Sequence, residues 1–281
     1  MATLLGSRGG ALALVPAAVW LSLFFLVPLL IVVLISGMRV GSPVEWSLDG
    51  SAYGRMLDPL CLRVVLRSVG LALCTTAICL ILGYPLAYYI ARTWSGRRYL
   101  LYFMVLIPLW ANSLVLIYAW MILLRPSGIL DQILEITGLG SDAPLSVLYT
   151  PWAVIVGLVY WYLPFMVYPL YAAIEKLDFS LLEAAYDLGA NRLQAFWRVL
   201  LPLTWPGVLT GCLLVFIESL GAFVVPDLLG GAKTLMLGNL IQQRFLSIPQ
   251  DWPLGAALAI VLLLAVGLSL AGYFWFSRRP A

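Results

Sequence analysis

Six stretches of the chain are long, apolar and almost free of charged residues, and this feature constrains the fold more than any other. They cover about residues 12–38, 66–91, 99–124, 148–173, 203–225 and 253–276. A membrane-spanning helix needs about 20 predominantly apolar residues, and each stretch reaches that length. The chain is therefore predicted to be an all-α integral membrane protein with six transmembrane helices.

The overall composition leads to the same class. Of the 281 residues, 63% are hydrophobic and 10% are charged, whereas about a quarter of the residues in an ordinary soluble domain are charged. A soluble fold of this length has too little interior to bury so much apolar surface, while a bilayer covers it directly. Alternating ten-residue segments typical of a membrane β-barrel are not visible.

Charge and metal-ligand content disfavour several functions. The net charge of +3 is too small to indicate nucleic acid as a partner. The chain has no histidine, and its four cysteines form no C-x-x-C pair, so no metal site is expected. No linker, low-complexity tract or internal repeat is visible, and residues 1–281 are predicted to form a single transmembrane domain. The first apolar stretch is too long for the core of a signal peptide and is predicted to be retained.

Basic residues predict the orientation, because cytoplasmic segments of membrane proteins are enriched in Lys and Arg. With both termini inside, the cytoplasmic segments hold nine basic residues and the outer segments hold seven. The cytoplasmic nine are Arg8, Arg92, Arg97, Arg98, Lys176, Arg192, Arg198, Arg278 and Arg279. Four of these form two adjacent pairs in short segments, Arg97-Arg98 and Arg278-Arg279. Both termini are therefore expected to be cytoplasmic.

One cytoplasmic loop, residues 175–202, has the pattern of two short helices. Ser180 followed three residues later by Glu183 predicts a capping box at the start of the first helix. Gly189 stands where a left-handed residue would end that helix. Asn191 is expected to cap the second helix, and Pro202 is expected to close it and open the fifth span.

The apolar residues of this loop exceed what a solvated connection needs. Those at helical spacing are Leu181, Leu182, Ala185 and Leu188 in the first helix, and Leu193, Phe196, Val199 and Leu200 in the second. Such a surface is expected to dock against something. Local physics leaves two alternatives open: a partner protein, or the membrane surface and the chain's own helix bundle.

The spacing of the loop resembles the EAA loop of ABC importer permeases, with Glu183-Ala184-Ala185, then Gly189, then Leu201-Pro202. The resemblance implies the type I ABC importer permease fold. It also implies that the loop forms a cytoplasmic coupling helix-turn-helix, which fits a cleft on an ATP-binding subunit. The residues carried over as ATPase-coupling residues are Glu183, Ala184, Ala185, Gly189, Leu201 and Pro202.

The chain carries no G-x-x-x-x-G-K-[ST] phosphate loop, so it is not expected to be an enzyme. The resemblance implies that ATP and Mg²⁺ are bound by a separate subunit, present in two copies, and that this chain needs no cofactor. It further implies a second homologous permease and a periplasmic or lipid-anchored solute-binding protein as partners. The expected location is the bacterial cytoplasmic (inner) membrane, in contact with lipid.

Further motifs resemble the spermidine/putrescine branch of these permeases, B type. They are residues 82–87, 107–113, 163–170, 227–233 and 251–257. The resemblance implies inward transport of spermidine or putrescine, and an importer of another small solute is the alternative. The sequence departs from this branch at Glu218, where proline is usual, at Ala222, which is often acidic, and at Leu116, which is often arginine.

Glu218 is the only acidic residue deep inside a predicted span, and such a residue indicates a functional site facing the bundle interior. The alternative is a protonated or hydrogen-bonded carboxyl with a packing role. Aromatic and polar residues suit contact with ammonium groups, although aromatic side chains also form interfacial belts. The other substrate-path candidates are Trp110, Asn112, Tyr118, Tyr160 and Asp227. An ion-coupled secondary transporter, which needs buried acidic pairs or inverted repeats, is the less favoured class.

Overall fold

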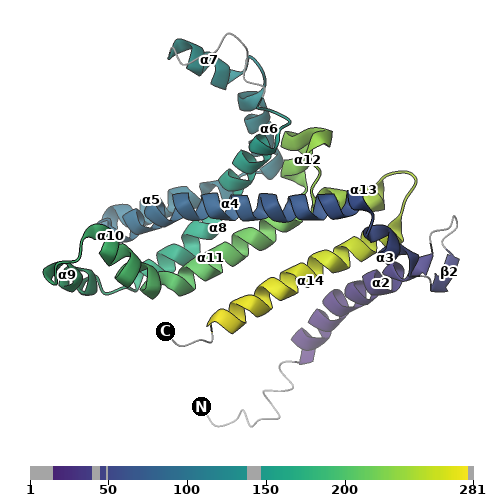
Figure 1. The fold of residues 1–281 in the computed structure, drawn as a ribbon, viewed down its shortest axis with the longest axis horizontal. Coiled ribbons are helices and arrows are strands. Elements are labelled where there is room, and N and C mark those ends of the chain that lie inside the picture. Colours follow the sequence, from purple (N-terminus) through teal and green to yellow (C-terminus); the bar gives the residue numbers. More distant parts are fainter. Residues whose placement is uncertain (1–14, 40–44, 49, 138–146, 278–281) are drawn as a thin grey trace. The chain divides into compact units, whose positions relative to one another are not determined.

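The computed structural model describes residues 15–39, 45–48, 50–137 and 147–277. Two short strands, β1 (Met38–Arg39) and β2 (Glu45–Leu48), pair antiparallel with an irregular register. The remaining elements are helices: η1 Ser22–Leu26, α2 Val27–Ser36, α3 Ser51–Met56, α4 Pro59–Arg92, α5 Ser95–Trp110, α6 Ser113–Leu124, α7 Ile129–Ile136, α8 Pro151–Glu175, α9 Ser180–Asp187, α10 Arg192–Ala195, η2 Phe196–Leu200, α11 Leu201–Gly221, α12 Val224–Gly230, η3 Gly231–Lys233, α13 Leu237–Leu246 and α14 Trp252–Ser277 (Figure 1).

Five of the six predicted spans are single helices long and apolar enough to cross a membrane. They run over Val15–Ser36, Pro59–Arg92, Pro151–Glu175, Arg192–Gly221 and Trp252–Trp275. Within the described residues, the all-α membrane fold is therefore confirmed. Residues 12–14 of the first predicted span, and the terminal arginines Arg8, Arg278 and Arg279, lie outside the described residues.

The third predicted span is not one straight helix. Gly96–Trp110 and Ser113–Leu124 meet at an angle of 93°, so the prediction of a single helix over 99–124 is wrong. Two residues at the break have extended backbone, Ala111 with ψ 154° and Asn112 with ψ 125°. The Asn112 side chain accepts a hydrogen bond from the Leu114 amide at 2.9 Å, and this cap starts a new helix.

The fifth span is longer than predicted, whereas the third is broken. Instead of ending at Pro202, the helix that begins at Arg192 continues to Gly221. A π-helical segment, Phe196–Leu200, immediately precedes α11. Pro202 is the second residue of α11 and directly follows this segment, whose wider π-helical turn lets the helix continue past the missing amide hydrogen. The expected second helix of the loop is thus the N-terminal extension of the span.

The contacts group the chain into two compact units, and each is described separately. One comprises residues 1–62 and 241–263, and the other residues 63–240 and 264–281. In the first unit, Arg55 of α3 forms a two-pronged ion pair with Asp251, with nitrogen–oxygen distances of 2.6 and 3.2 Å. Asp251 also accepts a hydrogen bond from the Leu254 amide in the first turn of α14. The single-domain expectation stays a prediction.

The core of the second unit is built around α8, against which α11 lies side by side (Figure 1). Small residues on α11 permit the close approach. An ideal Cβ on Gly207 would lie 2.5 Å from the Ala173 Cβ and 2.8 Å from the Pro169 carbonyl oxygen. At Gly211, the added atom would lie 2.7 Å from the Met166 sulfur. The helices therefore meet at a separation that only glycine allows at these positions.

This close contact generates a stability prediction for α11. Gly207→Ala is expected to destabilise the folded chain by about 1–3 kcal/mol, because the new methyl group meets both a side chain and a backbone oxygen. Gly221→Ala in the same helix is the matched control, since its Cβ would meet nothing within 4 Å. The measurement is thermal unfolding in detergent. Equal melting temperatures for the two variants would contradict the account.

Candidate coupling surface and transmembrane hollows

The loop between α8 and α11 begins with α9, whose start differs from the predicted capping box. The N-cap position is occupied by Phe179 and has no side-chain cap, so the Ser180–Glu183 capping box is wrong. The Asp178 carboxylate accepts a hydrogen bond from the Ser180 amide at 3.0 Å instead. This bond holds the pKa of the Asp178 carboxyl below its usual value.

The turn after α9 has the predicted geometry. Gly189 has a φ of +86°, in the left-handed region. The Ala190 amide donates to the Ala185 carbonyl at 3.0 Å, and the Gly189 amide donates to the Tyr186 carbonyl at 2.9 Å. This pair of bonds is the Schellman motif, which satisfies carbonyls left over at a helix end. The predicted role of Gly189 in ending the helix is confirmed.

The second helix starts at a reciprocal cap. The Asn191 side chain accepts from the Gln194 amide at 2.8 Å, and the Gln194 side chain accepts from the Asn191 amide at 3.0 Å. The predicted cap at Asn191 is therefore confirmed. Because both ends of the turn are satisfied locally, the loop adopts a defined bend between α9 and α10.

The residues predicted to couple to an ATPase lie mainly on the surface of this bend. Leu182 is 4% exposed and anchors α9 in the core of the second unit, whereas Leu188 is 89% exposed. The exposed coupling candidates are Glu183, Ala184, Gly189 and Pro202, while Ala185 and Leu201 are half-buried. The loop thus presents a fixed surface that carries uncovered apolar side chains. A coupling role for these six residues stays a prediction.

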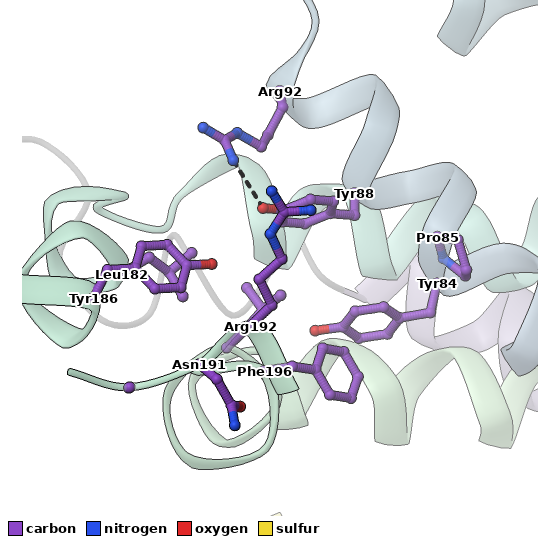
Figure 2. A pocket seen from close by; sticks show the side chains of 11 residues that line it. Tyr84, Pro85, Tyr88, Arg92, Leu182, Tyr186, Asn191, Arg192 and Phe196 are labelled. Atoms are coloured by element: carbon purple, nitrogen blue, oxygen red, sulfur yellow. Dashed lines mark hydrogen bonds between the residues drawn. The ribbon is translucent and has the colours of Figure 1, made fainter. Parts of the chain in front are cut away.

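A hollow of about 940 Å³ lies between the C-terminal part of α4 and the bend (Figure 2). We call it the basic hollow, and its lining residues are Tyr84, Pro85, Tyr88, Arg92, Leu182, Tyr186, Ala190, Asn191, Arg192, Phe196 and Leu200. The Arg92 guanidinium donates to the Tyr88 hydroxyl at 3.1 Å. It also lies 5.8 Å from the Tyr88 ring centre and 5.5 Å from that of Phe179.

Sequence reasoning missed the basic hollow, although a signal for it was present. Tyr84, Tyr88 and Arg92 are spaced four residues apart, which places them along one face of α4. The partners on the opposite wall come from α9, α10 and η2. Which wall faces α4 depends on how the bend folds back, and no local pattern contains that information.

Glu218 of α11 lines a second hollow, of about 320 Å³, which we call the Glu218 hollow. It is formed by residues of α6, α8, α11 and α12 and of the 222–223 connection. The walls include Trp161, Tyr162 and Phe223. The Tyr162 hydroxyl donates to the Glu218 carbonyl oxygen at 3.0 Å, which ties α8 to α11 at this level. The Glu218 side chain is exposed, and a carboxylate in the same wall as aromatic rings is chemically suited to hold a cation.

The other substrate-path candidates are not among the residues that line the Glu218 hollow. Trp110 is 76% exposed and packs edge-on against Phe103, with ring centres 5.1 Å apart. Tyr118 is exposed on α6, and Tyr160 is half-buried, packing edge-on against Trp120 with ring centres 5.4 Å apart. Their participation in a path stays a prediction.

The two polar candidates, Asn112 and Asp227, lie at the starts of helices. Asn112 is exposed and caps α6. Asp227 is exposed in the first turn of α12, where a negative charge is favoured by the helix dipole. Tyr162, which was not predicted, lines the Glu218 hollow instead. Within the described residues, no group of three or more Cys, Asp or Glu side chains is placed to hold a metal ion.

Comparison with known proteins assigns a family to this architecture. Residues 79–280 match the family described as "Binding-protein-dependent transport system inner membrane component". The chain is 47% identical over 261 residues to "Spermidine/putrescine transport system permease protein PotB" of Escherichia coli (strain K12), covering 92% of this chain and 94% of the relative. The protein of the same name from Haemophilus influenzae (strain ATCC 51907 / DSM 11121 / KW20 / Rd) is 46% identical over 257 residues, covering 91% and 89%.

Solved structures with low sequence identity share the fold. A chain of a bacterial ABC transporter involved in the import of alginate matches with a TM-score of 0.78 and 19% identity, over 97% of this chain and 96% of that chain. A chain of the MetNI methionine ABC transporter matches with a TM-score of 0.58 and 20% identity, over 79% and 98%. Both structures therefore support the predicted type I importer permease fold.

The cap at Asn191 generates a local prediction. Asn191→Ala removes the acceptor for the Gln194 amide and is expected to cost about 1 kcal/mol of local stability, which corresponds to roughly fivefold faster exchange of that amide. The measurement is hydrogen–deuterium exchange of the 191–196 segment. Asn191→Asp keeps an acceptor oxygen at the same place and is expected to retain protection. Equal exchange in both variants would contradict a capping role.

Proposed function

The chain belongs to the family of binding-protein-dependent transport system inner membrane components, and we propose that it carries spermidine, putrescine or both inward across the membrane. It is a multi-pass inner-membrane permease of an ABC importer. The observation that carries the polyamine assignment is the 47% identity to spermidine/putrescine permeases over 92% of the chain. The aligned region includes both the spans and the bend, so the similarity supports the assignment for the whole transport pathway of this chain.

The Glu218 hollow supports a cationic substrate. Polyamines are flexible polycations whose transfer needs negative counter-charge and aromatic faces. Glu218 supplies the carboxylate, and Trp161 and Tyr162 supply aromatic rings in the same wall. Ala222, where the resembled branch often has an acidic residue, lines the same hollow. A carboxylate moved by one helical turn therefore still reaches this space.

Energy is proposed to come from a separate ATP-binding subunit, present in two copies, that binds ATP and Mg²⁺. Its docking surface would be the exposed part of the bend, with Glu183, Ala184 and Gly189 at its centre. This arrangement requires the bend to face the cytoplasm and both termini to lie on that side. A second homologous permease and a solute-binding protein would complete the importer.

Substitution of Glu218 tests the substrate assignment. In proteoliposomes holding the intact importer, Glu218→Gln is expected to lower ATP-dependent uptake of radiolabelled spermidine and putrescine about tenfold, because the counter-charge is lost while the shape is kept. Basal ATP hydrolysis is expected to be retained. Glu135→Gln, which neutralises an exposed carboxylate on α7, is the matched control and is expected to keep uptake.

Two results of this assay would each contradict one part of the proposal. No polyamine uptake by an importer that hydrolyses ATP normally would remove the substrate assignment and leave the family intact. Full uptake by Glu218→Gln would remove Glu218 from the path and leave the substrate assignment intact.

A second substitution tests the docking surface. Glu183→Ala is expected to raise the Kd for the ATP-binding subunit about thirtyfold, as for an interface hot spot of about 2 kcal/mol. Asp187→Asn, at an exposed position of the same helix, is the control and is expected to change the Kd little. The measurement is equilibrium binding of the purified ATPase to the permease. Equal effects of the two substitutions would contradict the assignment of Glu183.

A further inference from the structure

The basic hollow carries two arginines that approach from different elements. Arg92 is the last residue of α4, and Arg192 is the first residue of α10. Figure 2 shows the Arg192 side chain extending from α10 toward α4, on the side where Tyr88 and Arg92 lie. Residues 100 positions apart in the sequence thus bring two permanent positive charges to one space.

No carboxylate balances these charges within the part of the chain that the structure describes. The residues that line the basic hollow include no Asp or Glu. The ion pairs of the described residues are Arg55–Asp251 and Arg98–Glu175, and neither involves Arg92 or Arg192. Among the described residues, the hydrogen bond and ring contacts of Arg92 are with neutral groups, the Tyr88 hydroxyl and two aromatic rings. The hollow is therefore complementary to an anion.

The other residues that line the hollow are mostly apolar, with a few polar groups among them. Leu182, Phe196 and Leu200 line the hollow, with Pro85 on α4. The ring of Phe196 packs edge-on against that of Tyr84, with centres 5.3 Å apart. Tyr186 and Asn191 add polar groups to the lining of the hollow. A ligand that fits this wall has an anionic end and an apolar body.

The surface proposed for the ATPase is separate from this wall. Leu182 and Tyr186, four residues apart, place one face of α9 in the basic hollow. Glu183 and Ala184 are exposed and do not line it. The basic hollow also lies at the end of a membrane-spanning helix, where lipid headgroups are present. These features favour lipid over protein as the occupant.

We propose that the basic hollow binds an anionic glycerophospholipid, with the headgroup phosphate between Arg92 and Arg192 and an acyl chain along the apolar wall. Basic pockets between membrane helices on the cytoplasmic side are suited to anionic headgroups. The inference rests on the orientation given under the proposed function. Bound lipid would connect α4 to the bend that carries the coupling surface, so it would stabilise the position of that bend.

The test is lipid binding by the intact importer in detergent, measured by native mass spectrometry with added phosphatidylglycerol or phosphatidylcholine. Preferential binding of phosphatidylglycerol is expected. Arg192→Gln is expected to weaken it about fivefold, and the Arg92→Gln and Arg192→Gln double variant about thirtyfold, for roughly 1 kcal/mol per basic residue. Arg198→Gln is the matched control, because Arg198 is exposed on the same continuous helix but does not line the hollow.

Several outcomes would overturn the proposal. These are equal binding of the two lipids, equal loss in the Arg198→Gln control, or displacement of phosphatidylglycerol by glycerol 3-phosphate at the same concentration, which would identify a site for free phosphate. Binding that appears only after removal of the ATPase would identify the ATPase as the occupant. Polyamine uptake is measured separately, so failure of lipid binding leaves the proposed function standing, and loss of uptake leaves the lipid site standing.

Discussion

The close contact between α8 and α11 is the interaction on which the functional parts of the chain depend. Gly207 and Gly211 allow α11 to approach the backbone of α8 near Pro169 and Met166. In lipid, apolar side chains gain little from meeting one another, so such helix pairs rely on close packing and on interhelical hydrogen bonds. The bond from the Tyr162 hydroxyl to the Glu218 carbonyl is one of these, and it fixes the wall of the Glu218 hollow. The Glu218 hollow and the bend are therefore attached to the same helix pair.

Under the proposed function, the bend is the part of this helix pair on which the ATP-binding subunit would act. The bend connects α8 directly to the 30-residue helix that begins at Arg192, so a push on the bend would act along the helix that carries Glu218. Leu182 fixes one face of α9 to the bundle, while Glu183 and Ala184 remain exposed. The Schellman turn at Gly189 and the cap at Asn191 remove local freedom from the connection. A rigid connection transmits displacement, whereas a floppy one would absorb it.

Local sequence rules predicted most of the fold but failed where neighbouring signals compete. Apolar length located the spans, because a bilayer imposes that length directly. The break at Asn112 was missed, because a capping residue inside an apolar stretch does not reveal whether its cap forms. Asp178 competes with Ser180 for the start of α9, and a π-helical segment lets the chain pass Pro202. Glu218 was identified as an isolated charge in a span, but its neighbour Tyr162 required the packing of α8 on α11.

The most direct test of the account is to determine which face of α9 meets the ATPase. A photo-crosslinking amino acid is introduced at Ala184 or at Tyr186 in the intact importer, and the adducts are identified by mass spectrometry. The account predicts an ATPase adduct from position 184 and none from position 186, because both positions are exposed but only position 186 lines the basic hollow. An ATPase adduct from position 186 alone, or none from position 184, would contradict the central claim that the exposed face of the bend couples ATP hydrolysis to transport.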